Sequence, residues 1–322
     1  MTGGSGFIGI HLVDLLRNQN YTVLNLDIKA PIDNRNIHLW RNVSVIDTEL
    51  LSKQILEFDP HYIVHLSATT TQDAKSLEDF EVNIQGTQNL VDVANNLPSL
   101  KKLIFTSTQY VNNPGYPISE DLSKLVPYGT YGESKLVGEK IVRNSFLGSS
   151  WIIIRPTTIW GPWHPILVSG LWKQISNGLY FHPRNDQSIK AYGYVENTAW
   201  QIEKLMRLEN RLTDKETFYL ADANLAQREW VETFVQRLRK RKMRKIPKTI
   251  LFFLSEFGEI LCKVRIRFPL YRSRYRNLVT SNPAPLDKTF SVLGKVPVGV
   301  DDAVNRTCNW LEEKYPSKTQ RL

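Results

Sequence analysis

Three glycines near the start of the chain, Gly3, Gly6 and Gly9, constrain its fold more than any other sequence feature. Glycines at this spacing let a strand turn sharply into a helix, let the backbone approach a ligand, and let the helix pack closely on a sheet. The amide groups at the start of such a helix attract phosphate. The run, which also contains Phe7 and Ile8, therefore predicts a loop that binds the diphosphate of a dinucleotide.

An acidic residue, Asp27, ends the apolar run 22–26, about twenty residues after the glycines. An acid at this point accepts hydrogen bonds from both ribose hydroxyls of adenosine and repels a 2′-phosphate. Asp27 therefore favours NAD over NADP. The alternative, a solvated strand end, fits less well with the glycines upstream.

Only Met1 and Thr2 precede the glycine loop, where this kind of fold needs an apolar strand. In the usual strand order that first strand is central, between the second and the fourth. Without it, two neighbouring strands lack partners for their backbone groups. We therefore hypothesise that the natural protein starts several residues upstream of Met1.

The composition limits the class of protein. With 322 residues, 42% of them hydrophobic, the chain can bury one large core or a core with a smaller lobe. No apolar stretch approaches the roughly 20 residues of a membrane-spanning helix, and no signal-peptide pattern is visible. The two cysteines and the scattered histidines lack metal-ligand spacing, so we expect no metal and a reduced, cytoplasmic protein.

Short β-rich runs alternate with helical patterns through the first half of the chain, which predicts an α/β fold with a doubly wound parallel sheet of the Rossmann-like type. The expected strands are 22–27, 42–46, 62–67, 102–108 and 151–156, and the expected helices are 49–58, 77–96 and 131–146. We expect a cofactor-binding domain over 1–158, to which elements near 190–222 return. The remainder, 159–322, is expected to form a smaller mixed α/β substrate lobe that begins with a Trp/Pro/Gly-rich loop at 160–165.

Three residues form a candidate catalytic set. Thr108 follows a predicted strand, at the edge where α/β sheets bind ligands. Tyr131 and Lys135 are four apart, so both lie on one face of the next helix. An ammonium group near a phenol lowers the pKa of the phenol, which would make Tyr131 a general base for a substrate hydroxyl while hydride leaves the same carbon. Thr108 would hold the reacting oxygen.

These motifs together resemble the extended short-chain dehydrogenases/reductases, and among them the NAD-dependent sugar-nucleotide epimerase/dehydratase family. Two further runs are similar to that family: 65–68, His-Leu-Ser-Ala, and 83–90, which begins Asn-Ile-Gln-Gly-Thr. The resemblance implies that Leu66, Ala68 and Asn83 lie beside the cofactor, and that Lys135 also holds the nicotinamide ribose. It further implies a nucleotide-diphosphate sugar in the C-terminal lobe and a homodimer.

The chain departs from the family pattern mainly on the substrate side. Gln109 and Tyr110 stand where dehydratases of the family have an acid pair, which argues against loss of water. Thr158 stands at a substrate-binding position that is often Asn. Lys190 stands where an Arg usually holds the diphosphate, and it supplies the charge without the bidentate fork.

The net charge of +9 is concentrated between Arg237 and Arg276, where 14 lysines and arginines accompany two glutamates and an apolar run at 250–261. Three interpretations remain open: a solvated helical face, a site for an anionic substrate, and peripheral contact with an anionic membrane. Nucleic acid is not expected, since no recognition module accompanies the charge.

The leading hypothesis is an NAD-dependent epimerase acting at C4 of a nucleotide-diphosphate sugar, through transient transfer of hydride. The first alternative is a net NAD-dependent dehydrogenase or reductase of a sugar or of a hydrophobic, sterol-like alcohol. The second is a non-catalytic NAD-binding module that docks on a partner or a membrane.

Overall fold

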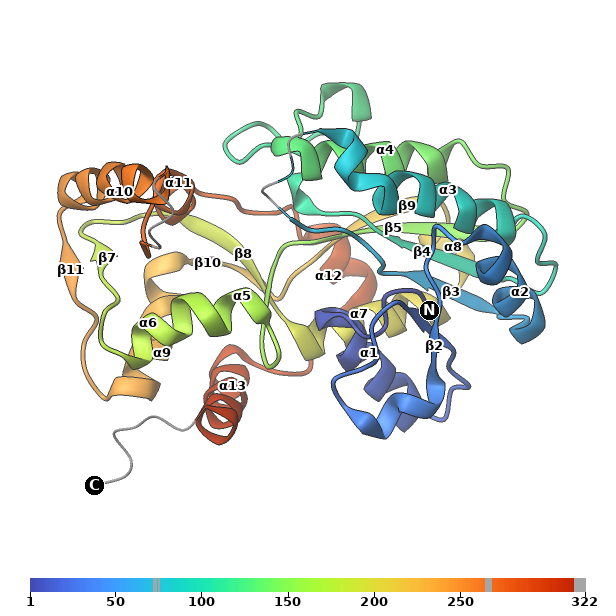
Figure 1. The fold of residues 1–322 in the computed structure, drawn as a ribbon, viewed down its shortest axis with the longest axis horizontal. Helices are drawn as coiled ribbons and strands as arrows, with labels where there is room; N and C mark the ends of the chain where they lie inside the picture. The colour runs from blue at the N-terminus through green and yellow to red at the C-terminus, as the bar shows by residue number, and fades with distance from the viewer. Residues whose placement is uncertain (72–73, 75, 264–267, 316–322) are drawn as a thin grey trace. The chain divides into compact units, whose positions relative to one another are not determined.

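The computed structural model describes residues 1–71, 74, 76–263 and 268–315, and the chain divides into two compact units. The first unit comprises 1–159, 195–222 and 285–297, and the second comprises 160–194, 223–284 and 298–322. Arg265 and Arg267 of the basic segment lie outside the described residues. Figure 1 labels the helices and strands along the chain.

The first unit alternates strands and helices. Its strands are β1 (Asn25–Asp27), β2 (Trp40–Asn42), β3 (Tyr62–His65), β4 (Lys102–Thr106), β5 (Ser150–Pro156) and β9 (Glu216–Leu220). Its α-helices are α1 (Phe7–Asn18), α2 (Thr48–Phe58), α3 (Glu81–Ala94), α4 (Gly129–Arg143), α7 (Val195–Arg207), α8 (Asn210–Thr213) and α12 (Asp287–Leu293). Short helical turns are η1 (Asn34–Leu39), η2 (Leu77–Phe80), η3 (Gln109–Val111) and η4 (Leu122–Lys124).

All strand pairs of this unit are parallel. The order β3-β4-β5-β9 forms one ladder, and β1 pairs with β2. Strand β9 comes from the second half of the chain and pairs with β5, so residues 216–220 of that half belong to the main sheet.

The central position between β1 and β3 is held by Met1, Thr2 and Gly3. Thr2 bridges Leu26 on one side and His65 on the other. The amide of Thr2 donates to the carbonyl of Val64 at 3.0 Å, and the amide of Gly3 donates to the carbonyl of Leu26 at 2.8 Å. The expectation that the neighbouring strands lack partners here is therefore wrong, because these residues supply backbone bonds to both sides.

Alternate residues of the strands enter two different hydrophobic cores, as the pleat of a sheet requires. Ile63, Leu103 and Ile153 pack against α2, α3 and α4 on one face. Ile104 and Ile152 pack against α1, α7 and α12 on the other face. Figure 1 shows the sheet between these two helical layers. The predicted doubly wound arrangement is confirmed for this unit.

One predicted strand is wrong in position. The run 42–46 was expected as a strand, but β2 ends at Asn42. The Trp40 indole donates to the carbonyl of Asp27 at 2.8 Å and the amide of Val43 donates to the same carbonyl at 3.4 Å, after which the chain turns. Val43 and Val45 still enter the core, which explains their apolar pattern outside a strand.

The second unit contains two small sheets and an aromatic core. Strand β6 (Thr158–Trp160) spans the boundary, because Thr158 belongs to the first unit and Trp160 to the second. The other elements of the second unit are α5 (Pro165–Leu167), η5 (Val168–Trp172), α6 (Lys173–Ser176), β7 (His182–Pro183), β8 (Ile189–Tyr194), β10 (Ala223–Ala226), α9 (Gln227–Arg239), β11 (Lys245–Ile246), α10 (Lys248–Lys263), α11 (Arg272–Val279) and α13 (Val300–Lys314). The sheets run β10-β8-β6 and β11-β7. Trp160, expected in a loop, instead ends β6 and is buried among Tyr194, Trp230 and Phe234.

Candidate active site

The glycine loop is packed too tightly for side chains at two positions. Gly3 has φ +71°, and a Cβ there would lie 2.5 Å from the amide nitrogen of Ser67. A Cβ on Gly9 would lie 2.4 Å from the carbonyl oxygen of Gly3. Gly6 is the N-cap residue of α1 and has no side chain that could cap the helix, and Phe7 and Ile8 follow in the first turn. A helix that begins with glycine at this position, next to a glycine loop, fits a diphosphate.

Asp27 ties the end of β1 to this loop. One carboxylate oxygen accepts from the amide of Ser5 at 3.0 Å, and the other accepts from the amide of Lys29 at 2.9 Å. Each carboxylate oxygen can accept a second hydrogen bond. Asp27 is thus held beside the glycines with acceptor capacity left for ribose hydroxyls, so the residues present fit the adenosine half of NAD.

Asn83 connects the segment after β3 to the catalytic helix. Its amide oxygen accepts from the Thr69 amide at 2.8 Å, and its amide nitrogen donates to the Thr69 carbonyl at 3.0 Å and to the Ser134 hydroxyl at 2.9 Å. The side chain is fully buried. Asn83 therefore fixes the position of Thr69, which follows Leu66 and Ala68 in the chain. It also binds Ser134, the residue that precedes Lys135 on α4.

Thr108 and Tyr131 come together as the sequence predicted. Thr108 precedes η3, just past the carboxyl end of β4, and its side chain lies beside the Tyr131 phenol, where it favours the ionised form of the phenol. Tyr131 belongs to the first turn of α4, where its ring packs on Phe80 at 6.2 Å between centroids. The pair presents two hydroxyls at the edge of the sheet where ligands of this fold class bind.

The charge states of Tyr131 and Lys135 differ from the sequence-based expectation. Burial raises the pKa of Tyr131 to about 12 and lowers the pKa of Lys135 to about 7. The Lys135 ammonium lies 4.7 Å from the centre of the Phe105 ring. The expected lowering of the Tyr131 pKa is therefore wrong for the chain by itself, because desolvation disfavours the charged form of each group.

A buried ion pair lies one turn after Lys135 and was not anticipated from the sequence. The Glu139 carboxylate accepts two hydrogen bonds from the Arg155 guanidinium, each of 2.8 Å, and a third from the Ser107 hydroxyl at 2.6 Å. Arg155 also donates to the Tyr219 hydroxyl at 2.9 Å. The sequence does contain a signal for this ion pair. Arg155 interrupts the apolar strand 152–156, and Glu139 lies on the face of α4 that carries Lys135.

The two expected substrate-binding residues belong to different units. Thr158 begins β6 and is half-buried in the first unit. Lys190 lies in β8 of the second unit, where its ammonium donates to the carbonyl of Asn277 at 2.5 Å and to the side-chain oxygen of the same residue. Burial lowers the pKa of Lys190 to about 8.

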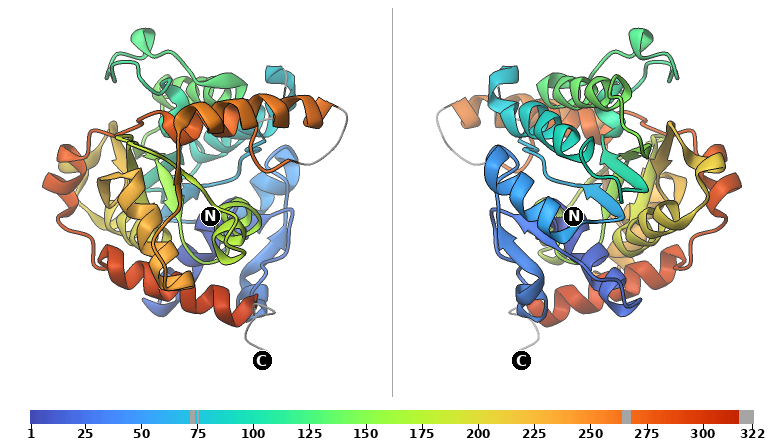
Figure 2. Two further views of the ribbon diagram at one scale, coloured as in Figure 1. Left: turned by 90° about the vertical axis from the view of Figure 1, so that its left-hand side faces the viewer. Right: turned by 90° about the vertical axis from the view of Figure 1, so that its right-hand side faces the viewer.

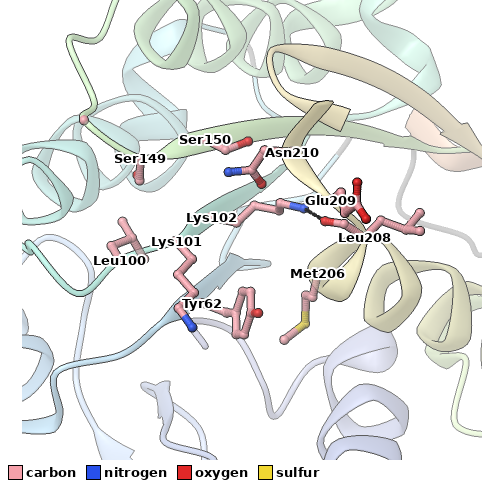
Figure 3. A pocket seen from close by; sticks show the side chains of 11 residues that line it. Tyr62, Leu100, Lys101, Lys102, Ser149, Ser150, Met206, Leu208, Glu209 and Asn210 are labelled. Atoms are coloured by element: carbon pink, nitrogen blue, oxygen red, sulfur yellow. Dashed lines mark hydrogen bonds between the residues drawn. The ribbon is translucent and has the colours of Figure 1, made fainter. Parts of the chain in front are cut away.

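A cavity of 320 Å³ lies elsewhere in the first unit (Figure 3). Tyr62, Lys102 and Ser150, which begin β3, β4 and β5, line it, so it opens at the amino ends of the strands. The Lys102 ammonium donates to the carbonyls of Leu205 and Leu208 at 3.1 and 2.6 Å, where α7 ends. Ligands of parallel sheets bind at the opposite, carboxyl edge. We therefore assign Lys102 a structural role as a cap for α7.

The Glu139→Gln variant tests the buried ion pair. It should lower the free energy of unfolding by about 3–5 kcal/mol, because the Arg155 guanidinium would be left buried without its carboxylate. Urea unfolding followed by circular dichroism measures the change. Glu133→Gln, on the exposed side of the same helix, should change it by less than about 0.5 kcal/mol. Equal effects of the two variants would contradict the assignment.

His65 should make the fold sensitive to acid. It is fully buried between the hydroxyls of Thr2 and Thr87, and burial lowers its pKa to about 3. Because the unfolded chain takes up this proton near pH 6.5, the stability contributed by His65 is lost as the pH falls from 6.5 toward 3. Between pH 6.5 and 4.5 the wild type should lose about 2–3 kcal/mol more than His65→Gln. Urea unfolding at several pH values measures this, with exposed His61→Gln as the control; parallel pH profiles of wild type and His65→Gln would refute it.

Comparison with known proteins places these observations in a family. The model of the NAD-dependent epimerase/dehydratase family matches residues 1–231. The N-acetyl-alpha-D-glucosaminyl-diphospho-ditrans,octacis-undecaprenol 4-epimerase of Escherichia coli O157:H7 is 27% identical over 75% of this chain and 72% of its own length. The decarboxylating sterol-4-alpha-carboxylate 3-dehydrogenase erg26 of Schizosaccharomyces pombe is 23% identical over 96% of each chain. For other curated relatives the match spans little more than half of their length.

The fold is also similar to solved structures. The UDP-glucose 4-epimerase of Thermus thermophilus, solved in complex with NAD, superposes with a TM-score of 0.72 at 22% identity, covering 97% of both chains. The matched residues 1–231 include the glycine loop, Asp27 and the set Thr108, Tyr131 and Lys135 described above. The chain belongs to the NAD-dependent epimerase/dehydratase family, and its cofactor is NAD.

Proposed function

We propose that this protein is an epimerase that inverts C4 of a sugar carried on a diphosphate, as a nucleotide-diphosphate sugar or a related conjugate. The neighbouring side chains of Thr108, just past the carboxyl end of β4, and Tyr131, in the first turn of α4, are the observation that carries the proposal. The 4-epimerase name of the Escherichia coli relative supports the position on the sugar. NAD, when bound, supplies the hydride acceptor and donor that such an inversion needs.

Each residue of the site would have a defined task. Tyr131, once ionised in the ligand-bound site, would take the proton of the C4 hydroxyl on its phenolate oxygen and later return it, while Thr108 holds the reacting oxygen in place. Lys135 would tune Tyr131 and hold the nicotinamide ribose. The glycine loop with Phe7 and Ile8 would bind the diphosphate of NAD, and Asp27 its adenosine ribose.

Two further residues are assigned to the substrate. We propose that Thr158 contacts the sugar or its phosphate and that Lys190 supplies positive charge to the diphosphate. Because Lys190 donates to Asn277, this role requires that hydrogen bond to be exchanged for one to phosphate. We further propose a cytoplasmic homodimer that works without a metal or nucleic acid.

Replacement of Tyr131 by Phe tests the catalytic assignment. Turnover should fall by about 10³-fold or more, because the proton acceptor is removed, while retained NAD should stay near the wild-type level. NMR of equilibrating UDP-glucose and UDP-galactose, and of their N-acetylated forms, measures turnover, and native mass spectrometry measures retained NAD. Tyr116→Phe, an exposed tyrosine elsewhere, is the control. Unchanged activity of Tyr131→Phe would disprove the role.

The second candidate is a net dehydrogenase of a hydrophobic alcohol, and the Schizosaccharomyces pombe relative, matched over 96% of this chain, favours it. The two functions differ in cofactor balance. An epimerase should release no net NADH and leave the mass of its substrate unchanged, because hydride returns to the same carbon. Stoichiometric NADH, measured by its absorbance, with an oxidised product by mass spectrometry, would support the dehydrogenase and exclude the epimerase.

A further inference from the structure

Helix α10 of the second unit presents an apolar stripe to solvent. Ile250, Phe253, Leu254, Phe257 and Ile260 are all exposed, from 39% for Leu254 to 70% for Phe253. Their spacing of three and four residues places them on one side of the helix. An uncharged stripe of this length on one helix face is the kind of surface that marks an interaction site.

The opposite side of α10 is the side that holds the helix to its unit. Leu251, Ser255 and Gly258 are buried, and a Cβ on Gly258 would lie 1.9 Å from the carbonyl oxygen of Leu270. Helices α10 and α11 lie side by side (Figures 1 and 2). Because the buried face of α10 provides its packing contacts with the rest of the unit, the exposed stripe is available to bind a partner outside the chain's own core.

The two helices α10 and α11 carry a surplus of positive charge. Lys248 of α10 and Arg274 and Arg276 of α11 are exposed, and within the described part of the chain none of them has a carboxylate partner. Meanwhile both acids of the basic segment are engaged by one residue: Arg272 forms an ion pair with Glu256, and its amide donates to Glu259 at 3.3 Å. The acids of α10 are thus compensated, and the surplus cations face solvent.

We propose that the α10 stripe, Ile250, Phe253, Leu254, Phe257 and Ile260, docks this protein on an anionic lipid bilayer, with the exposed lysine and arginines of α10 and α11 against the lipid headgroups. Apolar side chains on one face of a helix and cations around it are the two features that hold a helix in a membrane interface. A second copy of the chain is a poorer occupant, because it would bring two cationic surfaces together. Helix α10 has 16 residues, and among the described residues no helix is long and apolar enough to cross a membrane. The inference does not depend on the proposed reaction.

Co-sedimentation of the full chain with sucrose-loaded vesicles tests this inference. At about 50 mM NaCl the wild type should bind vesicles of phosphatidylcholine and phosphatidylglycerol (about 7:3) at least about tenfold more strongly than phosphatidylcholine alone. At about 500 mM NaCl the preference should largely disappear, because the surface charges are screened. No binding to the mixed vesicles, or equal binding to both kinds, would overturn the proposal.

Two pairs of matched variants assign the binding to α10. The double variant Phe253→Ser/Ile260→Ser should weaken partitioning at least about tenfold, because both side chains leave the bilayer. Phe146→Ser/Ile32→Ser removes the same residue types from exposed positions of the first unit and should leave it unchanged. Lys248→Gln/Arg276→Gln should weaken binding about fivefold for each cation removed, whereas Lys53→Gln/Lys140→Gln should not. Circular dichroism confirms that each variant is folded.

Sedimentation velocity distinguishes the competing occupant. If Phe253→Ser/Ile260→Ser separates a wild-type dimer into monomers but binds vesicles like the wild type, the stripe is an interface between copies and the membrane proposal is wrong. If the variant keeps the wild-type oligomeric state and loses vesicle binding, the membrane is the occupant.

Discussion

The buried ion pair between Glu139 and Arg155 is the interaction on which the geometry of the candidate site depends. It joins α4, which carries Tyr131 and Lys135, to β5, and the Ser107 hydroxyl extends the same network to the end of β4. A buried pair of this kind contributes little net stability compared with apolar residues, but it tolerates only one arrangement of its partners. The helix with the catalytic side chains is therefore fixed against the strands whose ends form the ligand edge.

Burial also determines the resting charge of the site. The pKa of Tyr131 is raised and that of Lys135 is lowered, so the phenol is neutral at pH 7 and the ammonium is close to its titration point. A phenolate needs compensation from a positive charge, and in this chain Lys135 faces the Phe105 ring instead. Proton transfer by Tyr131 therefore requires a bound ligand to change the surroundings of Tyr131 and Lys135 so that the phenolate is stabilised. The spacing of the two residues in the sequence does not reveal this requirement.

Local sequence patterns were sufficient to predict most of the fold. Features that depend on contacts between different elements could not be predicted from them. The glycine spacing and the alternation of strands and helices depend on neighbours within one motif, and the structure agrees with them. The start of β2 at Trp40 and the burial of Trp160 depend on partners that lie on other elements, and both were missed. Glu139 was missed for the same reason, because its partner lies on another element. Lys190 was placed by resemblance alone, and its contact with Asn277 has no trace in the local sequence.

The interleaving of the two units has a consequence for how this protein can be divided. The chain passes from one unit to the other after residues 159, 194, 222, 284 and 297, so neither unit is a continuous segment. The strand β9 and the helix α12 complete the sheet and the core of the first unit. Strand β9 is made only after residues 160–194 of the second unit, and α12 only after residues 223–284 as well. A nascent chain released at residue 159 would therefore lack the edge strand and two of the covering helices of its cofactor-binding unit. Dissection of the protein into single-function fragments would need circular permutation or co-expressed pieces, because no single cut yields either half intact.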